Sequence, residues 1–411
     1  MPKLELLKKF AKLAVETGAN VQKDQLVWVR SSVESKDLAR LIVEAAYKAG
    51  AKEVQVQWND PYVSRTGYDY MTAETLEEVP EWSVDKVKEF IAKGGCAISI
   101  TSPVPGLNAG VDPNKLQREG KARSKKLKFY SDHMMGNHTQ WSIVAAPNQV
   151  WAEKVFPELK GEEAVEALWD AILSASRVTE DNNPVQEWAD HNKGLLSHNK
   201  ILNDNNFESL HFKNSLGTDL VVKLVDNHVW AGGGENTTKG VYFNPNIPTE
   251  ENFTMPHKYG VEGRVVATKP LNYNGNLIED FYLDFEEGKV VSYDAKKAKE
   301  TLKSLIEFDE GSNRLGEVAL ISHNSPISNS GILFYNTLFD ENASCHLALG
   351  RSYPMNLKGG TTMSQDELDK ANSNNSMAHV DFMFGSKDMN IIGTKKDGTT
   401  VQIFKDGDFI I

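Results

Sequence analysis

Gln25-Leu26-Val27-Trp28-Val29-Arg30 is the stretch that decides how the first part of this chain folds. Its apolar and β-branched residues predict a buried strand. Residues 37–47 follow with apolar side chains at helical spacing, after Ser35 as a cap and before Gly50 as a stop. Residues 53–58 then predict a second strand. A strand, a helix and another strand with short connections indicate a parallel crossover unit.

Helices and strands continue to alternate around this unit. Helical patterns recur at 4–14, 84–92 and 162–173, and strand patterns recur at 96–100 and 141–146. Such alternation is typical of a sheet with parallel strands. We therefore expect residues 1–196 to form an α/β N-terminal domain with parallel crossover units.

The second half of the chain has a different pattern. Residues 191–206 are polar and rich in asparagine, which is typical of a connecting region. Short strands separated by turn residues follow at 210–212, 219–224, 263–268, 277–285 and 289–291. Hairpin turns are indicated by Asn274-Gly275, Glu287-Gly288, Asp397-Gly398 and Asp406-Gly407. We expect residues 197–411 to form a β-rich α+β C-terminal domain.

Composition and charge exclude some functions. The chain has 411 residues, enough for two hydrophobic cores, and a formal net charge of −12. An acidic chain disfavours nucleic-acid binding, because that binding depends on clustered lysine and arginine. The one basic stretch, residues 117–128, is interpreted as a solvated helix face. We expect no nucleic-acid partner.

The cysteines and the hydropathy pattern indicate a location. Cys96 and Cys345 are the two cysteines; they build no disulfide framework and fit a reducing compartment. The start of the chain lacks a signal-peptide pattern, and no apolar run approaches the roughly 20 residues that span a bilayer. We expect a cytoplasmic protein with no membrane partner.

Four segments of the second half concentrate the residues suited to chemistry, and the most informative is the one around His379 and Asp381. Alternate residues of a strand share a face, so these two side chains point the same way while Val380 and Phe382 point the other. An imidazole beside a carboxylate on a packed strand suits a metal site. A structural hydrogen bond between the two side chains is the other interpretation.

The other three segments supply more acids and one imidazole. His346 follows Cys345 at the start of an apolar stretch, and Glu317 lies in the strand pattern over 315–321. Glu250 and Glu251 are adjacent in an extended segment, so they face opposite ways. Carboxylate with imidazole suits a two-metal hydrolase, whereas Cys345 is interpreted as a buried structural cysteine. Tens of residues separate the segments, and spacing alone does not unite them.

The remaining histidines have simpler interpretations. His323 lies in a Ser/Asn/Pro loop and is interpreted as a loop residue. His133 and His138 are a weaker metal candidate in the first domain.

Taken in order, the four segments resemble the thermophilic-aminopeptidase family, the M29 metallopeptidases. The resemblance spans essentially the whole chain and is most specific at 246–251, 315–317, 339–353 and 379–383. It implies the metal ligands Glu251, Glu317, His346, His379 and Asp381, with Glu250 as the alternative to Glu251, and a site tyrosine at Tyr353. Asn252 departs from the aliphatic residue expected after the paired acids, which concerns local packing.

The resemblance also implies what the chain does. It implies a metal-dependent aminopeptidase with two divalent ions per chain, which are zinc, cobalt or manganese. Its substrates would be peptides with a free N-terminus, and the chain would form a homodimer. Residues 197–411 would then be the metal-binding catalytic domain.

This ligand set predicts attack on the peptide bond by a metal-activated water. We expect Glu317 or Glu251 to bridge the ions, and Tyr353, with Arg351 as a second donor, to stabilise the oxyanion. Glu250 would carry the proton to the leaving amine. Two other functions fit the same residues: a different two-metal amidase or dipeptidase, and a non-catalytic metal- or peptide-binding protein. The complete ligand set argues against the last.

Overall fold

The computed structural model describes residues 4–273 and 276–411. It combines helices with one parallel sheet and several antiparallel ones. The chain divides into two compact units. The first contains the residues up to Asp190 with Gly234–Pro248, and the second contains His191–Gly233 with Thr249–Ile411. The predicted domains, 1–196 and 197–411, differ from these units at residues 191–196 and 234–248.

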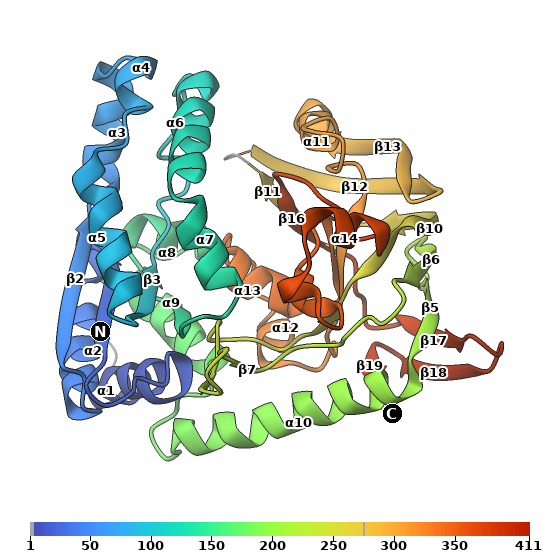
Figure 1. The fold of residues 1–411 in the computed structure, drawn as a ribbon, viewed down its shortest axis with the longest axis horizontal. Coiled ribbons are helices and arrows are strands. Elements are labelled where there is room, and N and C mark those ends of the chain that lie inside the picture. The colour runs from blue at the N-terminus through green and yellow to red at the C-terminus, as the bar shows by residue number, and fades with distance from the viewer. Residues whose placement is uncertain (1–3, 274–275) are drawn as a thin grey trace. The chain divides into compact units, whose positions relative to one another are not determined.

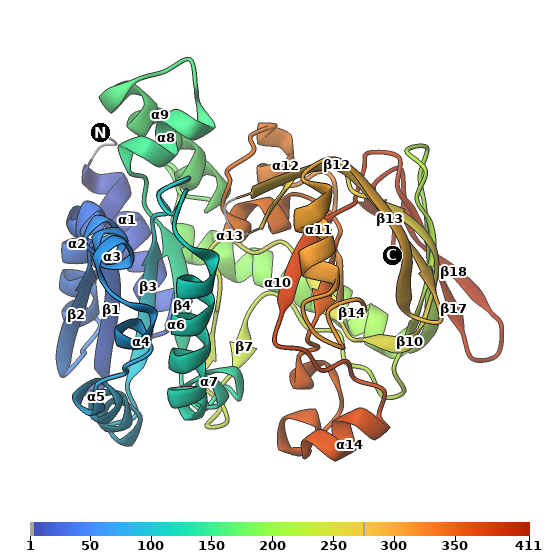
Figure 2. The same cartoon turned by 90° about the horizontal axis from the view of Figure 1, so that it is seen from above.

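The first unit is built on a four-stranded parallel sheet. Its strands are β1 (Leu26–Ser32), β2 (Glu53–Asn59), β3 (Cys96–Thr101) and β4 (Trp141–Ala145). They lie in the order β2-β1-β3-β4, as Figure 2 shows. The helix α2 (Lys36–Lys48) connects β1 to β2, so the predicted crossover unit is present.

Helices cover both faces of this sheet. Trp28 of β1 stacks on Phe90 of α5 with ring centroids 4.0 Å apart. Val29 follows Trp28 in the strand and so points to the other face of the sheet, where α2 contacts β1. The helices of this unit are α1 (Leu4–Leu13), α2, α3 (Pro61–Tyr70), α4 (Ala73–Leu76), α5 (Glu81–Ala92), α6 (Pro113–Lys126), α7 (Lys128–Met135), α8 (Gln149–Val155) and α9 (Gly161–Ala175).

The segment 234–248 belongs to the first unit through backbone contacts. The Ile143 N–H of β4 donates to the Pro245 carbonyl at 2.7 Å, and the Asn244 N–H donates to the Gly18 carbonyl at 2.9 Å. The segment also forms a small hairpin of β7 (Glu235–Asn236) and β8 (Tyr242–Phe243). A chain segment that follows residues of the second unit thus completes the first.

Residues 191–205, which the sequence indicates as a connecting region, are helical and begin at the boundary between the two units. They lie in α10 (Pro184–Asn205), drawn as a long green helix in Figure 1. From Trp188 onward its buried residues recur every three or four positions: Trp188, Asn192, Leu195, Asn199 and Leu202. Two of the five buried positions hold asparagine, so the apolar pattern of the helix is interrupted in the sequence.

The second unit is dominated by an antiparallel sheet. Its strands are β5 (Phe207–Lys213), β6 (Asp219–Leu224), β10 (Pro256–Val266), β11 (Leu271–Tyr273), β12 (Asn276–Glu286), β13 (Lys289–Lys297), β17 (Asn390–Lys395), β18 (Thr400–Lys405) and β19 (Asp408–Phe409). The predicted turns at Glu287-Gly288, Asp397-Gly398 and Asp406-Gly407 each join two paired strands. The turn predicted at Asn274-Gly275 lies outside the described residues.

A smaller sheet of the second unit carries the four segments that the sequence singled out. Its strands are β9 (Asn252–Thr254), β14 (Leu315–Leu320), β15 (His346–Gly350) and β16 (His379–Met383), in the order β16-β15-β14-β9. The helices α11 (Lys299–Ile306), α12 (Pro326–Ser330), α13 (Thr337–Asp340) and α14 (Gln365–Lys370) complete the unit. Among the described residues, no helix is long and apolar enough to span a membrane.

Candidate metal centre

A bulge in β14 sets the direction of Glu317. The pairing of β14 with β15 shifts between Leu315 and Glu317, so Leu315 faces Leu349 while Glu317 faces Ala348. Gly316 occupies the bulge, and a Cβ atom there would collide with the backbone carbonyl oxygen of Gly350. A glycine is therefore required at this position for the Glu317 carboxylate to reach the face that carries the other acids.

Strand register brings the carboxylates of Glu317 and Asp381 onto one face of the smaller sheet. Glu317 of β14 faces Ala348 of β15, and Ala348 faces Asp381 of β16. Residues opposite one another in an antiparallel sheet share a face, so the two carboxylates flank the small Ala348 side chain. His379 lies two residues from Asp381 and shares this face, as the sequence predicted.

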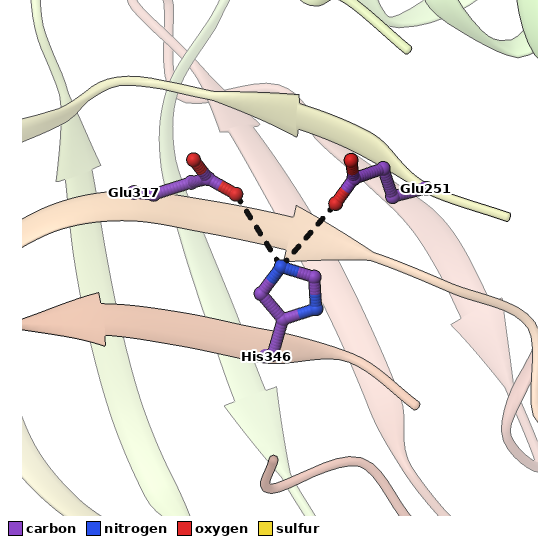
Figure 3. A group of neighbouring side chains, drawn as sticks. All are labelled: Glu251, Glu317 and His346. Atoms are coloured by element: carbon purple, nitrogen blue, oxygen red, sulfur yellow. Dashed lines mark hydrogen bonds and ion pairs between the residues drawn. The ribbon is translucent and has the colours of Figure 1, made fainter. Parts of the chain in front are cut away.

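His346 is held by one ring nitrogen and presents the other. Its Nδ1 lies 2.9 Å from the Glu341 backbone carbonyl, which only accepts, so Nδ1 carries the hydrogen. Its Nε2 lies 3.3 Å from Glu317 Oε1 and 3.3 Å from Glu251 Oε2. Figure 3 shows the imidazole pointing between the two carboxylates. We call Glu251, Glu317 and His346 the inner triad.

His379 repeats this construction. Its Nδ1 donates to the Arg351 backbone carbonyl at 2.7 Å. Its Nε2 lies 3.3 Å from Asp381 Oδ1 and 3.6 Å from Glu317 Oε2. We call Glu317, His379 and Asp381 the outer triad. A backbone carbonyl that fixes Nδ1–H leaves Nε2 as a ligand atom, which is the usual arrangement of metal-binding histidine.

The two triads fit divalent cations. In each triad one ligand atom per residue lies within 4.8 Å of the others, and Glu317 belongs to both. Asp381 Oδ1 is buried and has no hydrogen bond among the described residues, although His379 Nε2 is 3.3 Å away. A buried carboxylate oxygen that faces an imidazole nitrogen is suited to a cation that both can ligate. Nitrogen and oxygen ligands without thiolate suit zinc, cobalt and manganese.

The pKa values of the site reflect crowded acids. Burial raises the pKa of Glu317, and the neighbouring Glu251 and Asp381 raise it further, against the lowering effect of the two histidines. Burial lowers the pKa of His379, but Asp381 and Glu317 raise it more, to about 10. The site therefore favours cationic groups between its carboxylates.

Glu341 is a site residue that the sequence did not reveal. It lies in the 3-10 turn Glu341–Ala343 that follows α13. Burial raises the pKa of its carboxyl well above the usual range, and Asp381 and Glu251 raise it further. The charges of both triads therefore act on this carboxyl. The sequence signal was available, since Glu341 precedes His346 by five residues in the segment already identified.

Three further predicted site residues lie around the triads. The Tyr353 ring centroid is 4.5 Å from that of His379, and burial together with Glu317 and Asp381 raises the pKa of its hydroxyl well above 10. The side chain of Arg351 is exposed, whereas its backbone carbonyl holds His379. Glu250 Oε2 lies 3.7 Å from His191 Nε2, and Glu251 is the member of the pair that lies in the inner triad.

The other candidates lie elsewhere. Cys345 is buried, donates to the Ile321 carbonyl, and burial raises the pKa of its thiol to about 11. His133 and His138 stack with ring centroids 5.2 Å apart, and neither belongs to a metal-suited group among the described residues. His323 Nδ1 lies 3.4 Å from the Ser328 hydroxyl.

Known proteins share this arrangement of sequence and fold. The family described as thermophilic metalloprotease (M29) matches residues 3–409. This chain belongs to the M29 family. One M29 relative, aminopeptidase AmpS of Bacillus subtilis, is 48% identical, with 98% of each chain covered. Aminopeptidase 2 of Geobacillus stearothermophilus is 44% identical, with 98% of this chain and 97% of the relative covered.

A solved structure has the same fold. The wild-type AmpT structure from Thermus thermophilus superposes with a TM-score of 0.93 at 38% identity and covers 99% of both chains. The M29 family is one of metalloproteases, which agrees with the two triads of carboxylate and imidazole in this chain.

Proposed function

We propose that this chain is a metal-dependent aminopeptidase whose catalytic centre lies in residues 197–411 and holds two divalent ions. The M29 family and the relatives named aminopeptidase support the reaction class. The observation that carries the two-ion site is Glu317, whose two carboxylate oxygens face two different histidines. A carboxylate with one oxygen on each side is suited to bridge two ions.

The inner triad would hold one ion and the outer triad the other. When bound, these divalent ions lower the pKa of a water molecule and polarise the scissile carbonyl. The protein fixes both imidazoles through backbone carbonyls, so little rearrangement of ligands is needed on binding. Zinc, cobalt and manganese remain the candidate metals.

Glu341 is the residue best suited to move the proton to the leaving amine. Its carboxyl lies near Asp381 and Glu251, and its pKa is raised well above the usual range. A carboxyl with a raised pKa holds its proton more readily than an ordinary carboxyl, which suits a general acid. Glu250, the residue expected from the sequence, has His191 as its neighbour at 3.7 Å and is the second candidate.

Tyr353 is proposed as the donor to the oxyanion. Its raised pKa keeps the hydroxyl protonated at neutral pH, so it donates a hydrogen bond. Its ring lies beside His379 of the outer triad, at 4.5 Å between centroids. The exposed Arg351 side chain is a second donor in this proposal.

The same residues explain a preference for a free N-terminus. The centre holds the carboxylates of Glu251, Glu317, Glu341 and Asp381 and the imidazoles of two histidines. With the two ions bound, a free α-amino group would offer its lone pair as a further ligand, whereas the nitrogen of an acetylated N-terminus would not. We further propose that the chain is cytoplasmic and forms a homodimer. Size-exclusion chromatography with light scattering would test the homodimer.

The test compares free and N-acetylated peptides before and after metal removal. We expect cleavage from the free N-terminus only, loss of activity with a chelator, and recovery with zinc, cobalt or manganese. Cleavage of acetylated peptides would instead support another two-metal amidase or dipeptidase. Metal binding without any hydrolysis would support a binding protein.

A pair of variants makes this test specific to the site. We expect Asp381→Asn to lower activity by about 100-fold or more, since ligand loss costs several kcal/mol of transition-state stabilisation. Asp226→Asn is the matched control, because Asp226 is exposed and pairs with Lys396 at 2.6 Å. Equal activity of the two variants would contradict the proposed centre.

A further inference from the structure

A buried asparagine links two segments that carry inner-triad residues. Asn342 is fully buried in the turn that follows α13. Its Oδ1 accepts from the Glu250 N–H at 2.8 Å, and its Nδ2 donates to the Leu338 carbonyl at 3.1 Å. The two partners fix the orientation of the amide, because a backbone N–H only donates and a carbonyl only accepts.

The contacts of Asn342 close a ring that contains two residues of the inner triad. Glu251 follows Glu250 in the chain, and Glu341 precedes Asn342. The Glu341 carbonyl accepts from His346 Nδ1 at 2.9 Å, and His346 Nε2 lies 3.3 Å from Glu251 Oε2. The ring therefore runs from Glu251 through the Glu250 N–H, Asn342 and the Glu341 carbonyl to His346.

The outer triad does not depend on this ring. His379 and Asp381 are two residues apart on β16, and the Arg351 carbonyl holds His379. Its residues lie on β14 and β16, and the pairing of both strands with β15 sets their spacing. The inner triad instead needs Glu251 and His346 to be brought together from positions far apart in the chain.

The Glu250–Asn252 segment is held on its opposite side by a separate contact. The Asn252 amide donates to the Leu195 carbonyl at 2.9 Å and to Asn199 Oδ1 at 2.7 Å. These contacts fix the segment against α10, β9 pairs with β14, and the Asn342 amide joins the Glu250 N–H to the turn whose Glu341 carbonyl holds His346.

We propose that Asn342 is a positioning residue that sets the spacing of Glu251 and His346, and thereby the affinity of the inner triad for its ion. This inference rests on the proposed function, in which the inner and outer triads hold one ion each. Loss of the Asn342 amide removes the bond between the Glu250 backbone and the turn that holds His346. The inner site then weakens while the outer site keeps its ligands in place.

The experiment measures metal binding to the chelator-treated full chain by equilibrium dialysis with Co²⁺. We expect Asn342→Ala to weaken one of two sites by about 10- to 100-fold, the effect typical of residues that support metal ligands. The other site should change less than about threefold, since such supports act on the ligand they hold. With peptide substrate at saturating Co²⁺, KM should stay near the wild-type value, because the substrate's partners are unchanged.

Asn203→Ala is the matched control. Asn203 also bridges backbone groups through its side chain, since it bonds to both the N–H and the carbonyl of Trp230. It should leave both Co²⁺ affinities unchanged. If Asn342→Ala does not fold, Asn342→Ser removes the same amide with a smaller cavity and is expected to show the same selective loss.

The outcomes separate the two ideas. Suppose the wild type binds two ions, and the Asn342 variant loses Co²⁺ affinity equally at both sites or at neither. This result would overturn the positioning role and leave the proposed function standing. Fewer than two ions on the wild type overturn the two-ion site, and the inference falls with it. Selective loss of one site in both Asn342 and Asn203 variants would also overturn the role.

Discussion

The inner and outer triads share one acid and one construction, yet they are assembled differently. Each histidine has its Nδ1 held by a backbone carbonyl and its Nε2 directed at carboxylates. The His346 side chain is 1% exposed, whereas that of His379 is 19% exposed and lies beside Tyr353. For the proposed two-ion centre this difference predicts separate roles: the enclosed triad would retain its ion, and the more exposed one would meet the substrate.

The largest effect on activity is expected at Glu317, the acid that belongs to both triads. Glu317→Gln removes a carboxylate charge from each triad, and we expect activity to fall on the order of 1000-fold or more. Metal analysis should show fewer than two ions, while circular dichroism of the variant stays that of the wild type. Activity within tenfold of the wild type would remove the basis of the two-ion centre.

Tyr353→Phe tests the substrate-facing role of the outer triad. The variant keeps the ring against His379 and loses the hydroxyl, so kcat should fall by roughly 100- to 1000-fold with KM little changed. Steady-state kinetics with one unblocked peptide provide the measurement. A rise in KM at constant kcat would show that the hydroxyl binds the ground state instead.

Proton release distinguishes the metal-free and metal-bound triads. Without metal, burial lowers the pKa of His379 while Asp381 and Glu317 raise it to about 10, so metal must displace a proton at neutral pH. Affinity for Co²⁺ should rise about tenfold per pH unit for each displaced proton between pH 6.5 and 9. Titration calorimetry in buffers of different ionisation enthalpy measures this release, and pH-independent affinity would contradict it.

The raised pKa of His379 also predicts how the stability of the metal-free protein changes with pH. The folded-state pKa of His379 is above the unfolded value of about 6.5, so its contribution is fully present below that pH. The metal-free protein should therefore lose stability as the pH rises towards about 10. Thermal unfolding of the chelator-treated chain at pH 6.5 and 9 checks the direction, and a more stable protein at pH 9 would contradict it.

The smallest effect on activity is expected at Cys345, which precedes His346 of the inner triad. Burial raises the pKa of the Cys345 thiol to about 11, so it is not a thiolate at neutral pH. Cys345→Ser should change kcat/KM by less than about twofold, because no step uses the thiol. The variant thus serves as a control for damage to the neighbouring His346, and a large loss of activity would revive the nucleophile hypothesis.

The sequence predicted local features well. The β1–α2–β2 unit followed from residues 25–58, because the apolar patterns there are uninterrupted, although Ser35 at the start of α2 makes no side-chain capping bond. The shared face of His379 and Asp381 followed from the two-residue period of a strand. α10 was missed because Asn192 and Asn199 occupy buried positions where the helical pattern requires apolar residues.

Local sequence patterns could not predict how the site residues come together. The order β16-β15-β14-β9 joins segments that lie far apart in the chain, and local sequence patterns do not reveal the pairing that brings Glu251 near His346. Family resemblance supplied the ligand set where spacing did not. Glu341 was missed because its direction depends on the turn after α13, which has no periodic signature.

The return of residues 234–248 to the first unit has a consequence for how the protein is made. During synthesis the ribosome releases all of residues 191–233 before the chain supplies Pro245 and Asn244 to Ile143 and Gly18. The first unit therefore stays incomplete on the ribosome until part of the second has emerged. A fragment ending at residue 196 would likewise lack its β7–β8 hairpin, so neither unit is a contiguous piece that cloning can separate.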